Sequence, residues 1–137
     1  MVVVGAMTAL VLLLVGGLHE VWIFAVWPFA SRADFTRVVG GVDEDEAPPA
    51  WSTAAVAVLL LAAAYLVAGR AGIVGEIGPP WLHTVGAWGV TAVLLVRGVV
   101  GLTVFSRRRD IFGRMDRKVY SPLCVALATG SAVVALS

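Results

Sequence analysis

Four long runs of apolar residues constrain the fold of this chain more than any other feature. A helix that crosses the hydrocarbon core of a bilayer needs about 17–25 mainly apolar residues. The runs that meet this length are residues 2–29, 52–69, 82–105 and 120–137. The segments between them are too short and too divided to form a separate soluble domain. The sequence therefore predicts an all-α, polytopic membrane protein in which residues 1–137 form a single four-helix transmembrane bundle.

The composition agrees with this class. The chain is 60% hydrophobic and 14% charged, whereas soluble domains are about 45–50% apolar and about 25% charged. A formal net charge of +1 gives no reason to expect a nucleic-acid partner. The first apolar run has no Lys or Arg before it and is too long for the core of a signal peptide, so we expect it to remain as a transmembrane helix.

Proline and aromatic residues indicate where the helices begin and end. Pro79 and Pro80 end any preceding helix, and a new helix is expected to begin after them at the third run. Ser121 is predicted to be the N-cap of the fourth helix, with Pro122 in its first turn. Aromatic rings favour the water–lipid interface, and the rings near the ends of the runs are those of Trp27, Trp51, Trp81 and Tyr120.

The basic residues predict the orientation in the membrane. Eight of the 10 Lys and Arg residues lie in the loops 30–51 and 106–119, which four spans place on one side. The opposite loop contains only Arg70. Because loops rich in Lys and Arg stay in the cytoplasm, we expect a multi-pass plasma-membrane protein with both of these loops inside and both termini outside.

The first of these loops is predicted to have two parts. Phe35, Val38 and Val39 have helical spacing, which suits a short amphipathic segment on the membrane surface. The acidic run 43–46 that follows is expected to be a solvated linker, in preference to a segment folded back on the second basic loop.

Two charged residues lie within the predicted spans, Glu20 in the first and Arg97 in the third. Charges in such positions usually face the interior of a bundle, because exposure to lipid is costly. Both residues lie at similar depth, about 12–14 Å from the predicted cytoplasmic ends of their helices at about 1.5 Å per residue. We therefore predict a Glu20–Arg97 ion pair, with Gly98 and Gly101 allowing another helix to approach Arg97.

Other polar and aromatic residues are predicted to surround this pair. His19 and Trp22 share one face of the first helix because they are three residues apart. His83 is expected near the outer rim as an interfacial residue, too far from His19 for the two to ligate one haem. One cysteine and two histidines do not form a zinc ligand set, so no metal and no cofactor is predicted.

Three short motifs resemble a known family. These are Leu18–Trp22 in the first run, Val96–Gly98 in the third and Tyr120–Cys124 at the start of the fourth. Together they resemble a prokaryotic family of four-helix membrane proteins catalogued as domain of unknown function 3995. The segment Ile23–Pro28 departs from the family, which usually has a glycine-rich stretch after the tryptophan.

The resemblance implies a four-helix integral membrane fold and no established activity. The residues that it places at the recognisable positions of the family are His19, Trp22, Arg97, Tyr120, Ser121 and Cys124.

We expect a single polar pocket in the cytoplasmic half of the bundle, and the leading hypothesis is that it binds a lipid or a small amphiphile. The predicted ligand-binding residues are Trp22, Arg97, Tyr120, Ser121 and Cys124. The first alternative is an enzyme, such as an isomerase, in which His19 and Glu20 act as catalytic acid and base on a lipophilic substrate. The second is an accessory subunit whose basic loop 107–118 contacts anionic lipid or a membrane-protein partner. Transport is less favoured, since so small a bundle would need a homodimer.

Overall fold

The computed structural model describes residues 2–137 and is 80% helical, with no strand in that range. It has four helices that are long and apolar enough to cross a membrane. These are α1 (Val2–Phe24), α3 (Ala50–Arg70), α4 (Pro80–Thr103) and a continuous helix over Ile111–Leu136. The all-α fold and the multi-pass membrane class that the sequence predicts are confirmed.

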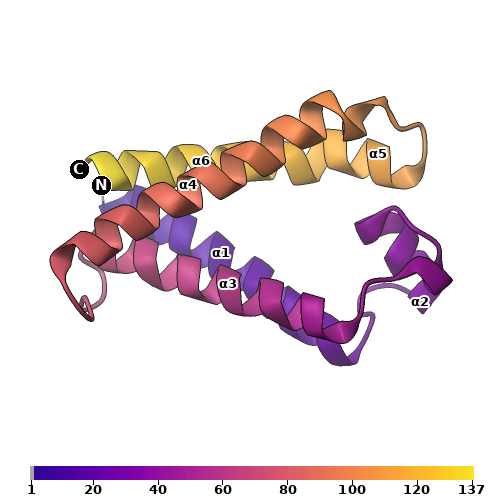
Figure 1. The fold of residues 1–137 in the computed structure, drawn as a ribbon, viewed down its shortest axis with the longest axis horizontal. Helices are drawn as coiled ribbons and strands as arrows, with labels where there is room; N and C mark the ends of the chain where they lie inside the picture. Colours follow the sequence, from indigo (N-terminus) through magenta and orange to yellow (C-terminus); the bar gives the residue numbers. More distant parts are fainter. Residues whose placement is uncertain (1) are drawn as a thin grey trace.

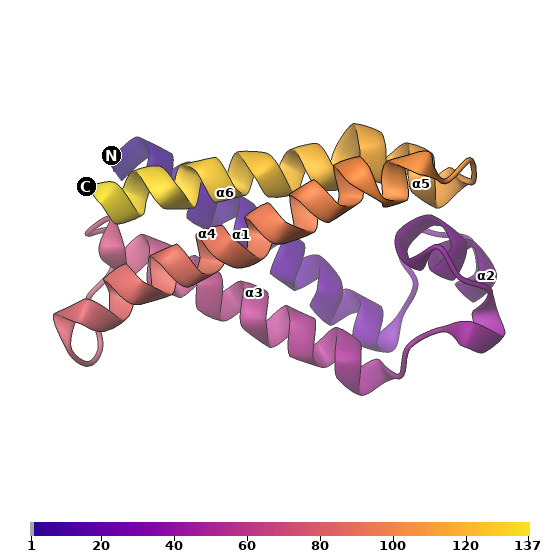
Figure 2. The same cartoon turned by 45° about the horizontal axis from the view of Figure 1, so that its top comes forward.

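The four long helices pack as two hairpins. Helix α1 packs along α3, and α4 packs along α6 (Ser121–Leu136), which is the last part of the continuous helix. The hairpins meet at the end of the bundle that holds both chain termini (Figure 1) and diverge toward the other end, where α2 (Arg32–Phe35) lies (Figure 2). We call the end that holds both chain termini the termini end. We call the other end, which carries residues 25–49 and 104–120, the basic end.

The buried core lies where the two hairpins meet. Its fully buried members include Leu12 of α1, Val67 of α3 and Val134 of α6. Close packing of this kind, more than the hydrophobic effect, holds helices together in lipid. Helix α3 supplies several of the buried residues, so it is part of the core.

The fourth long helix begins at Ile111, and the prediction that it begins at Tyr120 is wrong. Asp110 is its N-cap, and the Asp110 carboxylate accepts a hydrogen bond of 3.0 Å from the Gly113 backbone N–H. That bond and the Arg108 guanidinium hold the pKa of Asp110 below its ordinary value, against a smaller opposing effect of burial. The carboxylate is therefore ionised at neutral pH and stabilises a helix start within the predicted loop 106–119.

This helix contains a widened turn just before Pro122. It runs through α5 (Ile111–Met115), the π-helical turn η4 (Asp116–Tyr120) and α6. A proline has no N–H and its ring clashes with the carbonyl four residues earlier, so a widened turn there relieves the clash. The Ser121 N–H donates to the Asp116 carbonyl across this turn. Ser121 is thus inside a continuing helix, and its predicted role as an N-cap is wrong.

The first loop of the basic end folds into short helical turns. Helix α2 is capped by the Ser31 hydroxyl and is followed by the π-helical turn η1 (Thr36–Gly40). The acidic run forms the exposed 3-10 turn η2 (Glu44–Glu46). The short helical segment agrees with what the sequence predicts for this loop. The acidic run is exposed, but Asp43 and Glu46 share a hollow with Arg108 of the second basic loop, so it lies closer to that loop than the sequence predicts.

Two hydrogen bonds attach this loop to the second hairpin. The Tyr120 hydroxyl donates to the Val38 carbonyl at 2.9 Å, and Arg108 Nη2 donates to the Gly41 carbonyl at 2.6 Å. Gly41 has a φ of 68°, and a Cβ at that position would lie 2.7 Å from the Phe112 ring, so the site requires glycine on both counts. The loop is therefore held at the basic end between the ends of the two hairpins.

Candidate functional site

The predicted site residues separate into two groups in the structure. The first group, which we call the ion-pair cluster, consists of Arg97, Asp116 and Ser121 between α4 and the start of α6. Arg97 Nη2 lies 2.5 Å from Asp116 Oδ1, and the Ser121 hydroxyl donates to Asp116 Oδ2 at 2.8 Å. The Asp116 side chain is 0% exposed, and its carboxylate has partners on both oxygens.

The partner of Arg97 is thus Asp116, and the predicted Glu20–Arg97 ion pair is wrong. Glu20 is exposed on α1. Two residues at equal depth meet only when their helices are neighbours. Helix α1 packs mainly on α3, and α4 packs mainly on α6, so Glu20 and Arg97 do not face each other. The sequence does not predict Asp116 as a site residue, because Asp116 lies in segment 106–119, which is expected to be a loop.

A pattern in the sequence could have revealed Asp116. Phe112 and Asp116 are four residues apart and buried, whereas Arg114, Arg117 and Lys118 are exposed, which is the pattern of an amphipathic helix. Extending the fourth helix back to Asp110 by this pattern would have placed a carboxylate inside the bundle.

Glycines bring α4 and α6 close enough to form the cluster. A Cβ on Gly98 would lie 2.6 Å from Val125 Cγ2, and one on Gly101 would lie 2.5 Å from Asp116 Oδ2 and would overlap Ser121 Oγ. The close approach that the sequence predicts beside Arg97 is therefore confirmed. The Arg97 guanidinium also lies 5.2 Å from the centroid of the Phe105 ring, in a cation–π contact.

The other two predicted residues of the fourth helix lie near this cluster. Tyr120 immediately precedes Ser121, and its hydroxyl is used by the bond to the first loop. Cys124 lies on the next turn of α6 as a free, half-buried thiol. The cluster is closely packed, and its two charges neutralise each other.

The second group forms a groove of about 410 Å³ at the basic end. It is enclosed by the last turns of α1, the first turns of α3 and the loop between them. Its lining residues are His19, Trp22, Ile23, Arg32, Phe35, Thr36, Val39, Gly40, Val42, Ala47, Pro48, Ala50, Ser52, Thr53 and Val56. His19 and Trp22 thus face a different space from the ion-pair cluster, and the predicted single pocket is wrong.

Aromatic contacts build one wall of this groove. The ring of Trp22 lies 4.9 Å from that of His19 and 5.0 Å from that of Phe35, between ring centroids. His19 Nδ1 is 2.8 Å from the Val15 carbonyl, and Trp22 Nε1 donates to the Trp27 carbonyl at 2.8 Å. These bonds fix the orientation of both rings toward the groove.

Glu20 is not among the residues that line the groove. His19 and Glu20 therefore share no enclosed space in this structure, although they are adjacent in the sequence. The geometry offers no support for the predicted pairing of these two residues as acid and base.

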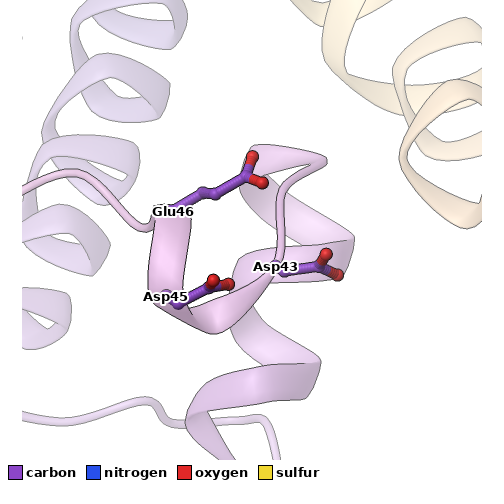
Figure 3. A group of neighbouring side chains, drawn as sticks. All are labelled: Asp43, Asp45 and Glu46. Atoms are coloured by element: carbon purple, nitrogen blue, oxygen red, sulfur yellow. The ribbon is translucent and has the colours of Figure 1, made fainter.

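The other face of segment 41–47 borders a second hollow, of about 360 Å³. Its charged residues are Arg37, Asp43, Glu46, Arg108 and Asp110, so both signs of charge are present. Figure 3 shows Asp43, Asp45 and Glu46, whose carboxylates project from the acidic turn and have oxygens within 4.8 Å of one another. All three are exposed, and we assign no metal to them.

His83 is buried in the structure, which the sequence does not predict, although it lies near a helix end as expected. Its ring is 0% exposed, contacts Tyr65 at 5.3 Å between centroids, and lies against Gly69. It is in the first turn of α4, which begins at the termini end (Figure 1), whereas His19 lines the groove at the basic end.

The fold and these two groups of residues define a small multi-pass membrane protein that has a groove at one end of its bundle. The model of the family described as "Protein of unknown function (DUF3995)" matches residues 7–131, and the chain belongs to this family. Comparison with curated proteins and with solved structures gave no match. The family that the motifs of the sequence resemble is thereby confirmed.

Proposed function

We propose that this protein binds a membrane lipid or a related amphiphile in the groove at its basic end. The observation that carries the proposal is the combination of size and lining. Ligand sites are clefts of about 300–1,000 Å³ with mostly apolar walls and a few polar groups, and the groove of about 410 Å³ matches this description. Ile23, Phe35 and Val56 supply apolar wall, and Arg32 and Thr53 supply polar groups.

The position of the groove supports a ligand taken from the bilayer. The groove lies between the end of α1 at Phe24 and the start of α3 at Ala50. Trp27 and Trp51, beside these two helix ends, are exposed, as interfacial tryptophans are. An amphiphile at this level has its chain among the helices and its polar end at the surface. We place the basic end in the cytoplasm, because it carries most of the Lys and Arg residues.

Filling the groove tests this proposal. Val56→Trp puts a large ring into the groove and is expected to weaken lipid binding about tenfold, a loss of about 1.4 kcal/mol. The measurement is lipid titration of the purified protein, followed by native mass spectrometry. Val58→Trp is the matched control, because Val58 is an exposed residue of α3 that does not line the groove. The proposal would be contradicted if both variants lost bound lipid equally, or if neither variant lost any.

A further inference from the structure

We infer that the ligand of the groove is a phospholipid with an anionic head group, and that Arg32 binds this head group. The inference rests on the proposed function and adds to it the chemical class of the ligand. It depends on the charges around the groove, on the pairing of the arginines near it, and on the polar groups left free on its wall.

The two hollows of the basic end differ in their charge balance. The second hollow has two arginines, Arg37 and Arg108, together with the carboxylates of Asp43, Glu46 and Asp110. The groove has Arg32 and no carboxylate among its described lining residues. Both hollows border the same segment at Val42, yet the acidic run lies on the side of the second hollow only. The positive charge of the groove is therefore uncompensated by the protein.

The pairing of the arginines leads to the same conclusion. Arg37 is 2.7 Å from Asp34, Arg97 is 2.5 Å from Asp116, and Arg108 is 2.5 Å from Asp110. Within residues 2–137, which the structure describes, Arg32 has no such ion pair, and neither have Arg107, Arg109 and Arg114 of the second loop, but Arg32 is the one that lines the groove. A guanidinium is permanently charged and matches the geometry of phosphate oxygens. An anionic phosphate bound beside Arg32 would supply the missing counter-charge.

The remaining polar groups of the groove complement a head group that carries hydroxyls as well as a phosphate. The Val15 carbonyl can only accept, so His19 Nδ1 donates to it, and Nε2 is the ring nitrogen left to contact a ligand. The Ser52 hydroxyl donates to the Pro49 carbonyl at 2.7 Å, which leaves its oxygen free to accept. A glycerol-type head group offers hydroxyls, which both donate and accept, to these two groups and an anion to Arg32.

The apolar wall indicates that this head group belongs to a lipid and not to a free solute. Phe35, Val39 and Val56 would gain little from glycerol phosphate alone, whereas an acyl chain would cover them. An experiment can therefore distinguish a lipid from free glycerol phosphate, because only the lipid has an acyl chain that covers this wall.

The test compares Arg32→Gln with Arg37→Gln as a matched control. Both arginines lie in the short helical turns of the first loop, but Arg37 already has Asp34 as its partner. The probes are phosphatidylglycerol and phosphatidylcholine with identical acyl chains, and sn-glycerol 3-phosphate without a chain. The readout is the dissociation constant of each probe for the full chain, and thermal stability in phosphatidylcholine micelles verifies that the variants are folded.

The wild type is expected to bind phosphatidylglycerol about fivefold more tightly than phosphatidylcholine, which is the contribution of one arginine near an anionic lipid. Arg32→Gln should remove this preference by weakening phosphatidylglycerol binding more than phosphatidylcholine binding, because the choline group of phosphatidylcholine already neutralises its phosphate. Arg32→Lys and Arg37→Gln should retain the preference. Equal affinity of the wild type for the two lipids, or an unchanged preference in Arg32→Gln, would overturn the inference. Glycerol phosphate that binds as tightly as the lipid would overturn a lipid as the source of the head group.

These outcomes are distinct from failure of the proposed function. If Val56→Trp weakens the binding of both lipids while the wild type does not discriminate between them, the groove binds amphiphiles and only the anionic class is wrong. If Val56→Trp weakens neither, the groove is not the binding site.

Discussion

Replacing Arg97 with leucine is expected to lower the free energy of unfolding by about 3–5 kcal/mol, the usual effect of removing one partner from a buried ion pair. Asp116 is 0% exposed, so without Arg97 its charge would remain in the interior with only the Ser121 hydroxyl as a partner. The measurement is equilibrium unfolding in mixed micelles titrated with sodium dodecyl sulfate. An effect below about 1 kcal/mol, typical of an exposed pair, would contradict the buried pair.

A double-mutant cycle tests whether the effect belongs to the pair. Asp116→Leu alone is expected to destabilise less than Arg97→Leu, because the Arg97 side chain is 35% exposed and its charge would not be left fully buried. The double variant Arg97→Leu/Asp116→Leu should be more stable than Arg97→Leu alone, since no buried charge then remains unpaired. Strictly additive effects of the two substitutions would show that the residues do not interact.

Gly101→Ala is expected to destabilise the protein by about 1–3 kcal/mol, the range for forcing atoms into a well-packed site. The new methyl group would overlap Ser121 Oγ and lie 2.5 Å from Asp116 Oδ2 and 2.7 Å from Arg97 Nη1. These side-chain ends cannot move aside without breaking the bonds that hold them to one another. The unfolding titration used for Arg97 measures this change as well.

Gly89→Ala is the control for this substitution. Gly89 is on the same helix, and a Cβ there would meet nothing within 4 Å. Alanine favours a helix over glycine by about 0.5–1 kcal/mol, so this variant should be as stable as the wild type or more so. Destabilisation by Gly89→Ala equal to that by Gly101→Ala would mean that the close approach of α4 and α6 is not the cause.

The helices of this protein could be predicted from the sequence because membrane insertion leaves a simple signal. Runs of apolar residues, Pro79 and Pro80, and the glycines beside Arg97 each indicate one local feature, and the structure agrees with them. The start of the fourth helix was missed because Arg107–Lys118 is rich in charge. Its helical start depends on the capping carboxylate of Asp110 and on the burial of Phe112 and Asp116, which is a much weaker signal.

The candidate site could be predicted only in part, for a different reason. Sequence position gives the depth of a residue along its helix, but it does not give which helices are neighbours. Glu20 and Arg97 have matching depths, yet they belong to different hairpins. Of the groove, only His19 and Trp22 could be predicted as site residues, because the loop residues Arg32 and Val39 form its wall only after the loop has folded back over α1 and α3.

The two groups of residues are connected through the first loop. Asp116 and Tyr120 are the first and last residues of the π-helical turn, and Tyr120 donates to the carbonyl of Val38. Val38 belongs to η1, whose neighbouring residues Thr36 and Val39 line the groove. The ion-pair cluster thus fixes the helix that in turn holds one wall of the groove.

Photo-crosslinking tests the central claim, that a lipid chain occupies the groove, most directly. The probe is phosphatidylglycerol with a diazirine in its acyl chain, activated on the purified protein and mapped by peptide sequencing. The account predicts adducts concentrated on residues of the groove wall such as Phe35, Val39 and Val56. Adducts spread evenly over exposed lipid-facing residues such as Leu14 and Val58, with no enrichment in the groove, would contradict it.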